Sequence, residues 1–113
     1  MKRTNEKNAI AEKLLMLGMP ANVLGFRYIC HAIYLARNDE SYLSLMTKRL
    51  YREVAETYGT SPESVERAMR HAISLCYERG DLELLRRYCP FVPDFKSKRP
   101  TCSEFISAFV YLD

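Results

Sequence analysis

Side chains that can hydrogen-bond to nucleic-acid bases cluster in one stretch of the chain, between residues 62 and 79. At 100° per residue, about half of this stretch is apolar and the other half is polar, as in a helix with one buried face. The polar half consists of Glu63, Glu66, Arg67, Arg70, His71 and Ser74. These residue types present donors and acceptors to base edges, whereas a solvated helix face favours paired lysine and glutamate. The stretch therefore predicts a helix that reads DNA.

Two positions on this polar face also allow plainer interpretations. Arg67 and His71 lie one turn apart in the half of the helix that normally enters a DNA groove. His71 is equally consistent with a polar residue that is hydrogen-bonded within the protein where two helices pack together. Arg70 follows Glu66 by four residues, which is the spacing of an intrahelical ion pair.

The elements that must position this face have the pattern of a helix-turn-helix. A preceding helix is expected from about residue 47 to 58, and Gly59 suits the turn that follows it. Ala55 supplies a small residue where the two helices cross, while Val65 and Ala68 can pack back onto the first helix. The spacing favours DNA binding, and an ordinary helical hairpin is the alternative.

Helix start and stop signals divide the rest of the chain. A first helix is expected to be capped by Thr4 or Asn5 and to end at Gly18, and a second to be capped by Asn22 and to fade near residue 38. A short segment over residues 41–45 leads into the helix-turn-helix, whose second helix starts at Ser61–Pro62 and ends at Gly80. Further turns over 81–88, a proline-rich loop over 89–101 and a last helix from Ser103 complete the expected order.

Composition sets the class of protein. The chain has 113 residues, of which 48% are hydrophobic and 27% charged, so one domain with one core is expected and a disordered chain is excluded. No apolar run approaches the roughly 18 residues of a membrane helix. Seventeen lysines and arginines against fourteen acidic residues give a net charge of +3, which permits nucleic-acid binding without requiring it. With few glycines and prolines, the composition predicts an all-α fold.

Catalysis, metals and cofactors are not expected. The four cysteines, Cys30, Cys76, Cys89 and Cys102, form no Cys-x-x-Cys pair, so free thiols in a reducing cytoplasm are predicted instead of a zinc site. The chain lacks a Gly-x-Ser-x-Gly elbow and a glycine-rich phosphate loop, and its two histidines fall on separate helices. The sequence therefore predicts a protein that is not an enzyme.

Several separated motifs carry a family resemblance over nearly the whole chain. They are VERAMRHAI at 65–73, ERG at 78–80 and RPTCSEFI at 99–106, with LGMPA at 17–21, Gly25, Tyr28, Ala32–Ile33 and TKRLY at 47–51. In this order they resemble the C-terminal DNA-binding domain of stage zero sporulation protein A, the response regulator of endospore formation. The resemblance implies an all-α bundle of about six helices around a helix-turn-helix of the winged-helix-like superfamily, which regulates transcription in the bacterial cytoplasm at the nucleoid.

The resemblance also assigns roles residue by residue. Glu66, Arg67 and His71 match positions that approach bases. Positions near the DNA backbone or the minor groove are matched by Arg70, Lys48, Arg49, Lys98 and Arg99. Double-stranded DNA is the implied partner, with an RNA polymerase sigma factor and a second copy bound in tandem as further partners.

Three departures from the family pattern matter. Ser64 stands where the family commonly has an arginine facing DNA, and Tyr77 replaces a tryptophan. In the family a receiver domain that accepts a phosphoryl group precedes this domain, and the 113 residues leave no room for one. Ser64 and the modest net charge support an alternative function, a helical interaction module that does not bind DNA and pairs with a full-length regulator.

Overall fold

The structure, a computed structural model, describes residues 2–88 and 99–111, and this part of the chain is all-α. The helices are α1 (Lys2–Leu17), α2 (Leu24–Asn38), α3 (Ser41–Ser44), α4 (Tyr51–Tyr58), α5 (Pro62–Arg79), α6 (Leu82–Tyr88) and α7 (Cys102–Tyr111). A five-residue π-helical segment, η1 (Met46–Leu50), leads directly into α4. The predicted fold class is confirmed.

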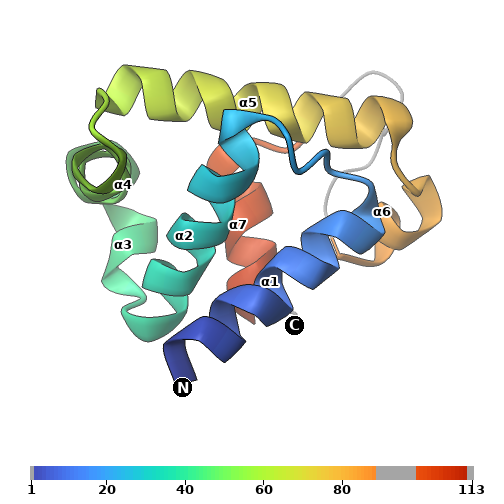
Figure 1. The fold of residues 1–113 in the computed structure, drawn as a ribbon, viewed down its shortest axis with the longest axis horizontal. Coiled ribbons are helices and arrows are strands. Elements are labelled where there is room, and N and C mark those ends of the chain that lie inside the picture. Colours follow the sequence, from blue (N-terminus) through green and yellow to red (C-terminus); the bar gives the residue numbers. More distant parts are fainter. Residues whose placement is uncertain (1, 89–98, 112–113) are drawn as a thin grey trace.

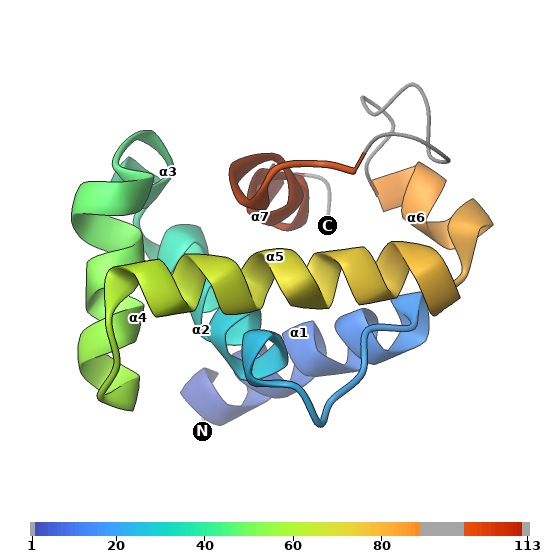
Figure 2. The ribbon, with the colours of Figure 1, turned by 90° about the horizontal axis from the view of Figure 1, so that it is seen from above.

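Helix α2 is the centre of the arrangement, since it contacts α1, α3, α4, α5 and α7 (Figure 1). Figure 2 shows α5 as a long helix across one side, with α4 at its N-terminal end and α6 at its C-terminal end. The guanidinium of Arg37 in α2 donates two hydrogen bonds to the carbonyl of Phe109 in α7, at 3.0 and 2.7 Å. The largest fully buried side chains are Phe105, Phe109, Ile10, Leu14, Leu17, Met19, Ile29, Ile33, Leu50, Met69, Ile73 and Leu85. None of the described helices is both long and apolar enough to cross a membrane.

Most helix boundaries follow the local signals in the sequence. Gly18 and Gly59 have φ angles of +100° and +67°, a conformation that glycine adopts without steric cost, and they end α1 and α4. Ser61 is the N-cap of α5, since its side chain accepts a hydrogen bond from the Ser64 amide at 3.1 Å. Pro62 occupies the first turn, where its missing amide hydrogen costs nothing.

The first two predicted N-caps are wrong. Helix α1 already begins at Lys2, so Thr4 and Asn5 lie within it instead of capping it. Val23, and not Asn22, is the N-cap of α2, with an extended backbone and no side-chain cap bond. Water can satisfy the first amide groups of an exposed helix end, so a capping side chain is not obligatory there.

The last helix begins one residue before the predicted Ser103. Thr101 and Glu104 form a reciprocal capping box around the start of α7. The Glu104 amide donates to Thr101 Oγ1 at 3.1 Å, and the Thr101 amide donates to Glu104 Oε1 at 2.9 Å. Cys102 is therefore the first helical residue.

The π-helical segment was not expected from the sequence, which predicts a regular helix from about residue 47. Its amides reach back further than in an α-helix, as in the hydrogen bond from the Leu50 amide to the Leu45 carbonyl at 3.1 Å. Leu50 is buried, while Thr47 and Lys48 are exposed. The extra residue in the turn thus keeps Leu50 in the core and leaves two polar residues in solvent.

His31 lies half-buried on α2 among aromatic rings. Its ring meets Tyr58 edge-on with centroids 5.8 Å apart, and its Nδ1 is buried without a hydrogen-bond partner among the described residues. Burial, and to a smaller extent the positive charge of Lys7, lowers the pKa of His31 from 6.5 to about 4. The folded protein therefore favours the neutral imidazole.

We expect this histidine to make the fold less stable in mild acid. The unfolded chain takes up the proton first, so the stability that His31 contributes is present above pH 6.5 and is lost as the pH falls towards 4. Urea unfolding at pH 7, 6 and 5 should show a steeper loss of unfolding free energy for the wild type than for His31→Phe. Parallel pH profiles for the two proteins would contradict this prediction.

Candidate nucleic-acid interface

The N-terminal half of α5 presents its polar residues outward because the opposite face is embedded in the core. Val65, Met69, Ala72, Ile73, Cys76 and Tyr77 are buried, and α5 contacts α2, α4 and α7 through this side. Glu63, Arg67, Arg70 and His71 are exposed, whereas Glu66 and Ser74 are half-buried. The predicted division of this helix into an apolar and a polar half matches the structure.

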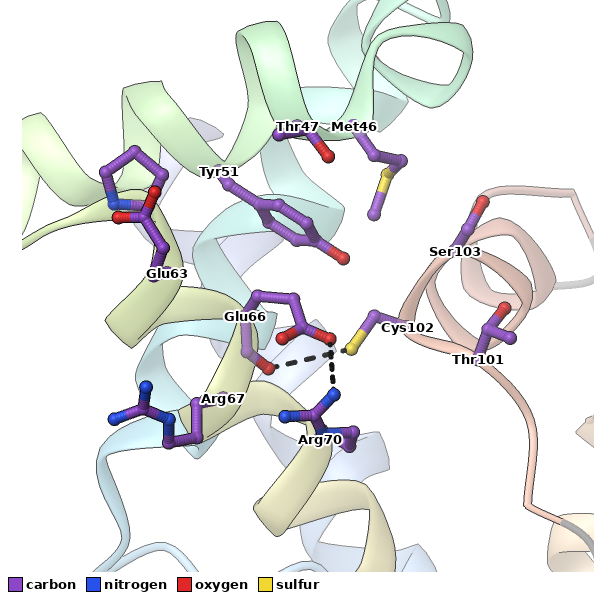
Figure 3. Close-up of a pocket in the computed structure, with 11 residues that line it drawn as sticks. Met46, Thr47, Tyr51, Glu63, Glu66, Arg67, Arg70, Thr101, Cys102 and Ser103 are labelled. Carbon is purple, nitrogen blue, oxygen red and sulfur yellow. Dashed lines mark hydrogen bonds and ion pairs between the residues drawn. The ribbon is translucent and has the colours of Figure 1, made fainter.

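A hollow of about 480 Å³ lies beside this half of α5, between η1, the start of α4 and the start of α7 (Figure 3). It is lined by Met46, Thr47, Tyr51, Pro62, Glu63, Glu66, Arg67, Arg70, Thr101, Cys102 and Ser103. The polar face of α5 is therefore one wall of a larger polar surface. His71 and Ser74 do not line the hollow.

Glu66 and Arg70 form the ion pair that their spacing allows. Arg70 Nη1 lies 3.2 Å from Glu66 Oε2, and the two side chains are 63% and 34% exposed. Pairs of this kind on an exposed helix contribute only about 0.3–0.5 kcal/mol, so a ligand that offers either group a better partner can separate them.

Arg67 and His71, on the surface of α5, form no such ion pair with any residue that the structure describes. Both are exposed, so His71 does not occupy the seam between helices that was its plainer interpretation. Figure 3 shows the guanidinium of Arg67 pointing away from Thr47 and Cys102. Of the three residues predicted to approach bases, Arg67 and His71 are exposed, whereas Glu66 is half-buried and paired with Arg70.

Two of the residues that line the hollow, Cys102 and Tyr51, are uncharged. Cys102 is buried and its thiol donates to the Glu66 carbonyl, with 3.9 Å between sulfur and oxygen. Burial raises the pKa of the Cys102 thiol and the pKa of the Tyr51 phenol, so both groups stay protonated near neutral pH. The charged residues that line the hollow, Glu63, Glu66, Arg67 and Arg70, all belong to α5.

Several residues of the hollow were not among the predicted site residues. Thr47, Tyr51, Thr101, Cys102 and Ser103 come from elements far apart in the chain, and periodicity cannot show that they meet. The available signal was the family resemblance, whose TKRLY and RPTCSEFI motifs contain all five residues.

The remaining predicted contacts lie around this surface in different environments. Lys48 is exposed on η1, whereas the neighbouring Arg49 is half-buried and forms an ion pair with Asp39 at 2.9 Å. Arg99 is half-buried, with its guanidinium 5.6 Å from the centre of the Tyr77 ring. Lys98 lies outside the described residues.

Ser64, the position where the family commonly has an arginine, belongs to the start of α5. Its side chain is half-buried and its hydroxyl hydrogen-bonds to that of Ser61 at 2.9 Å. Ser64 therefore supports the N-cap instead of extending from the helix.

Three of the predicted free thiols are observed. Cys30, Cys76 and Cys102 are buried and unbridged, and Cys89 lies outside the described residues. Within residues 2–88 and 99–111, His, Cys, Asp and Glu side chains form no group of three that could hold a metal ion.

An all-α scaffold that exposes arginine, histidine and glutamate along one half of a long helix is consistent with the class of helical nucleic-acid-binding domains. The chain matches the protein family described as "Sporulation initiation factor Spo0A C terminal" over residues 10–111. It belongs to this family, which is a family of sporulation-related DNA-binding effector domains and not an enzyme family.

Proposed function

We propose that this chain is a sequence-specific regulator of transcription that binds double-stranded DNA and reads bases with α5. The observation that carries the proposal is the exposure of Arg67 and His71 one turn apart in the N-terminal half of that helix. An α-helix fits the major groove of B-DNA, where each base pair presents a distinct set of donors and acceptors. Family membership supports the same function.

In this proposal some residues contact DNA bases and others contact the DNA backbone or the minor groove. The planar guanidinium of Arg67 can donate to O6 and N7 of one guanine, and the Glu66 carboxylate can accept from a cytosine amino group. His71 offers a further ring nitrogen to a base edge one turn on. Arg70, Lys48, Arg99 and Lys98 are assigned to phosphates or to the minor groove, where they add affinity and orientation but little sequence information.

The N-terminal half of α5 enters the groove with α4 packed across its start. The turn at 59–61 and the helix contacts between α4 and α5 keep these two elements in one orientation, as a helix-turn-helix requires. An RNA polymerase sigma factor and a second copy bound in tandem stay predictions from the family resemblance.

A gel-shift titration tests the proposal. The protein is titrated against a duplex carrying the DNA box of the sporulation regulator family and against a scrambled duplex of the same composition. We expect tighter binding to the box at each salt concentration, with both affinities falling as salt rises. Equal affinity for the two duplexes would contradict sequence-specific binding. No binding to either would favour the alternative, an interaction module that pairs with a full-length regulator.

A further inference from the structure

Lys48 and Arg49 are adjacent cations with the same predicted role, yet their surroundings differ. Lys48 is exposed. The Arg49 guanidinium makes three contacts. Its Nη2 lies 2.9 Å from Asp39 Oδ2, and its Nη1 donates a hydrogen bond to the Ser41 hydroxyl. The guanidinium also lies 4.1 Å from the centre of the Tyr42 ring. The donors of Arg49 are therefore directed back towards the protein.

These contacts belong to a network that joins four elements. Asp39, just after α2, accepts hydrogen bonds from the Ser41 amide at 3.0 Å and the Ser41 hydroxyl at 2.7 Å. Tyr42 in α3 donates its hydroxyl hydrogen to the Glu53 carboxylate in α4. Hydrogen bonds from Ser41 and the charge of Arg49 lower the pKa of Asp39, so its carboxylate is ionised at neutral pH. Arg49 thus ties η1 to both α2 and α3.

The segment that Arg49 holds, η1, has an irregular backbone. A π-helical turn is rare and its geometry requires support from its surroundings. Met46 and Thr47 of η1 line the hollow beside α5, so the position of η1 determines where this side of the interface lies. Lys48 follows them directly in the chain.

We propose that Arg49 is a positioning residue, which holds η1 so that Lys48 neutralises a DNA phosphate while Arg49 itself stays on Asp39. The proposal rests on the DNA-binding function proposed above. An isolated exposed ion pair contributes little, but stacking on Tyr42 and the shared hydrogen bonds make this guanidinium part of a network.

Asp39→Asn distinguishes a positioning role of Arg49 from a simple effect of net charge. The two explanations predict opposite changes in DNA affinity for this variant. Loss of an exposed negative charge should strengthen DNA binding if only net charge matters. If Asp39 anchors Arg49, the same substitution should weaken binding to the box duplex by about two- to tenfold, the lower part of the range for residues coupled through one network. Glu40→Gln is the matched control, since it removes the same charge from the neighbouring exposed residue and leaves the Arg49 ion pair intact.

Lys48→Ala supplies the second half of the test. Alone, it should reduce the slope of log affinity against log salt by about one unit. In the Lys48→Ala background, Asp39→Asn should have no further effect, because the contact that it positions is already absent. Tighter binding by Asp39→Asn, as by Glu40→Gln, would overturn the proposal, and so would an equal loss with and without Lys48.

A measurement without DNA keeps this proposal separate from the function on which it rests. Hydrogen exchange of the Arg49 and Leu50 amides, which bond to the Leu45 carbonyl, reports directly on η1. We expect faster exchange in Asp39→Asn and wild-type exchange in Glu40→Gln. Unchanged exchange in Asp39→Asn would overturn the positioning role even if DNA binds. If the wild type binds no duplex, the proposed function and the role of Lys48 both fail, and exchange still decides whether Arg49 holds η1.

Discussion

Arg67→Ala is expected to abolish most of the preference for the family's DNA box while leaving affinity for scrambled DNA nearly unchanged. Arg67 is exposed on the N-terminal half of α5, and its fork can hold O6 and N7 of one guanine. Loss of such a bidentate contact costs about 1–3 kcal/mol, or roughly 5- to 150-fold in affinity, on the box alone. Titration of both duplexes at several salt concentrations measures this difference.

Arg79→Ala is the matched control for charge. It removes the same cation from the exposed last turn of the same helix, away from the hollow. We expect it to weaken binding to both duplexes by a similar small factor. If Arg67→Ala behaves like Arg79→Ala and weakens box and scrambled DNA alike, then α5 does not read sequence through Arg67.

Gly25→Ala is expected to cause a large loss of stability. A Cβ atom at Gly25 would lie 2.1 Å from the Ala68 carbonyl oxygen and 2.8 Å from the Ala72 Cβ, so α2 and α5 would have to separate. Overpacking of a core typically costs about 1–3 kcal/mol, and here the obstacle is backbone, which cannot rotate aside. Because α5 would shift, binding to the box duplex should weaken together with the melting temperature.

Gly59→Asn serves as the control for that prediction. Gly59 has open space around a Cβ, and asparagine tolerates its left-handed backbone, so only a small change in melting temperature is expected. On helix propensity alone, Gly25→Ala would stabilise the protein by up to about 1 kcal/mol. A raised melting temperature for Gly25→Ala would therefore show that α2 and α5 do not approach closely at this point.

The parts of the fold that local chemistry controls could be predicted from the sequence. Gly59, Ser61 and Pro62 define the turn and the start of α5, and the structure has both there. The start of α7 was also readable, since Thr101-Cys102-Ser103-Glu104 has the spacing of a capping box. Periodicity alone placed that start one residue too late.

Features that depend on distant segments could not be predicted in this way. The close approach of Gly25 to Ala68 joins residues 43 positions apart. The polar face of α5 follows from its own periodicity, but the hollow beside it forms only when three separate elements meet. For the same reason, the sequence treats Lys48 and Arg49 alike, whereas Asp39 and Tyr42 distinguish them in the fold.

The most direct test of base reading by α5 replaces single atoms in the DNA. Each guanine of the box is exchanged in turn for 7-deazaguanine, which keeps base pairing and O6 but lacks the N7 acceptor in the major groove. We expect one such exchange to weaken binding of the wild type and to have no further effect on Arg67→Ala, because that variant has already lost the contact. Wild-type affinity that is unchanged by every exchange, or a loss that persists in full in Arg67→Ala, would contradict the assignment of Arg67 as the residue that reads this base.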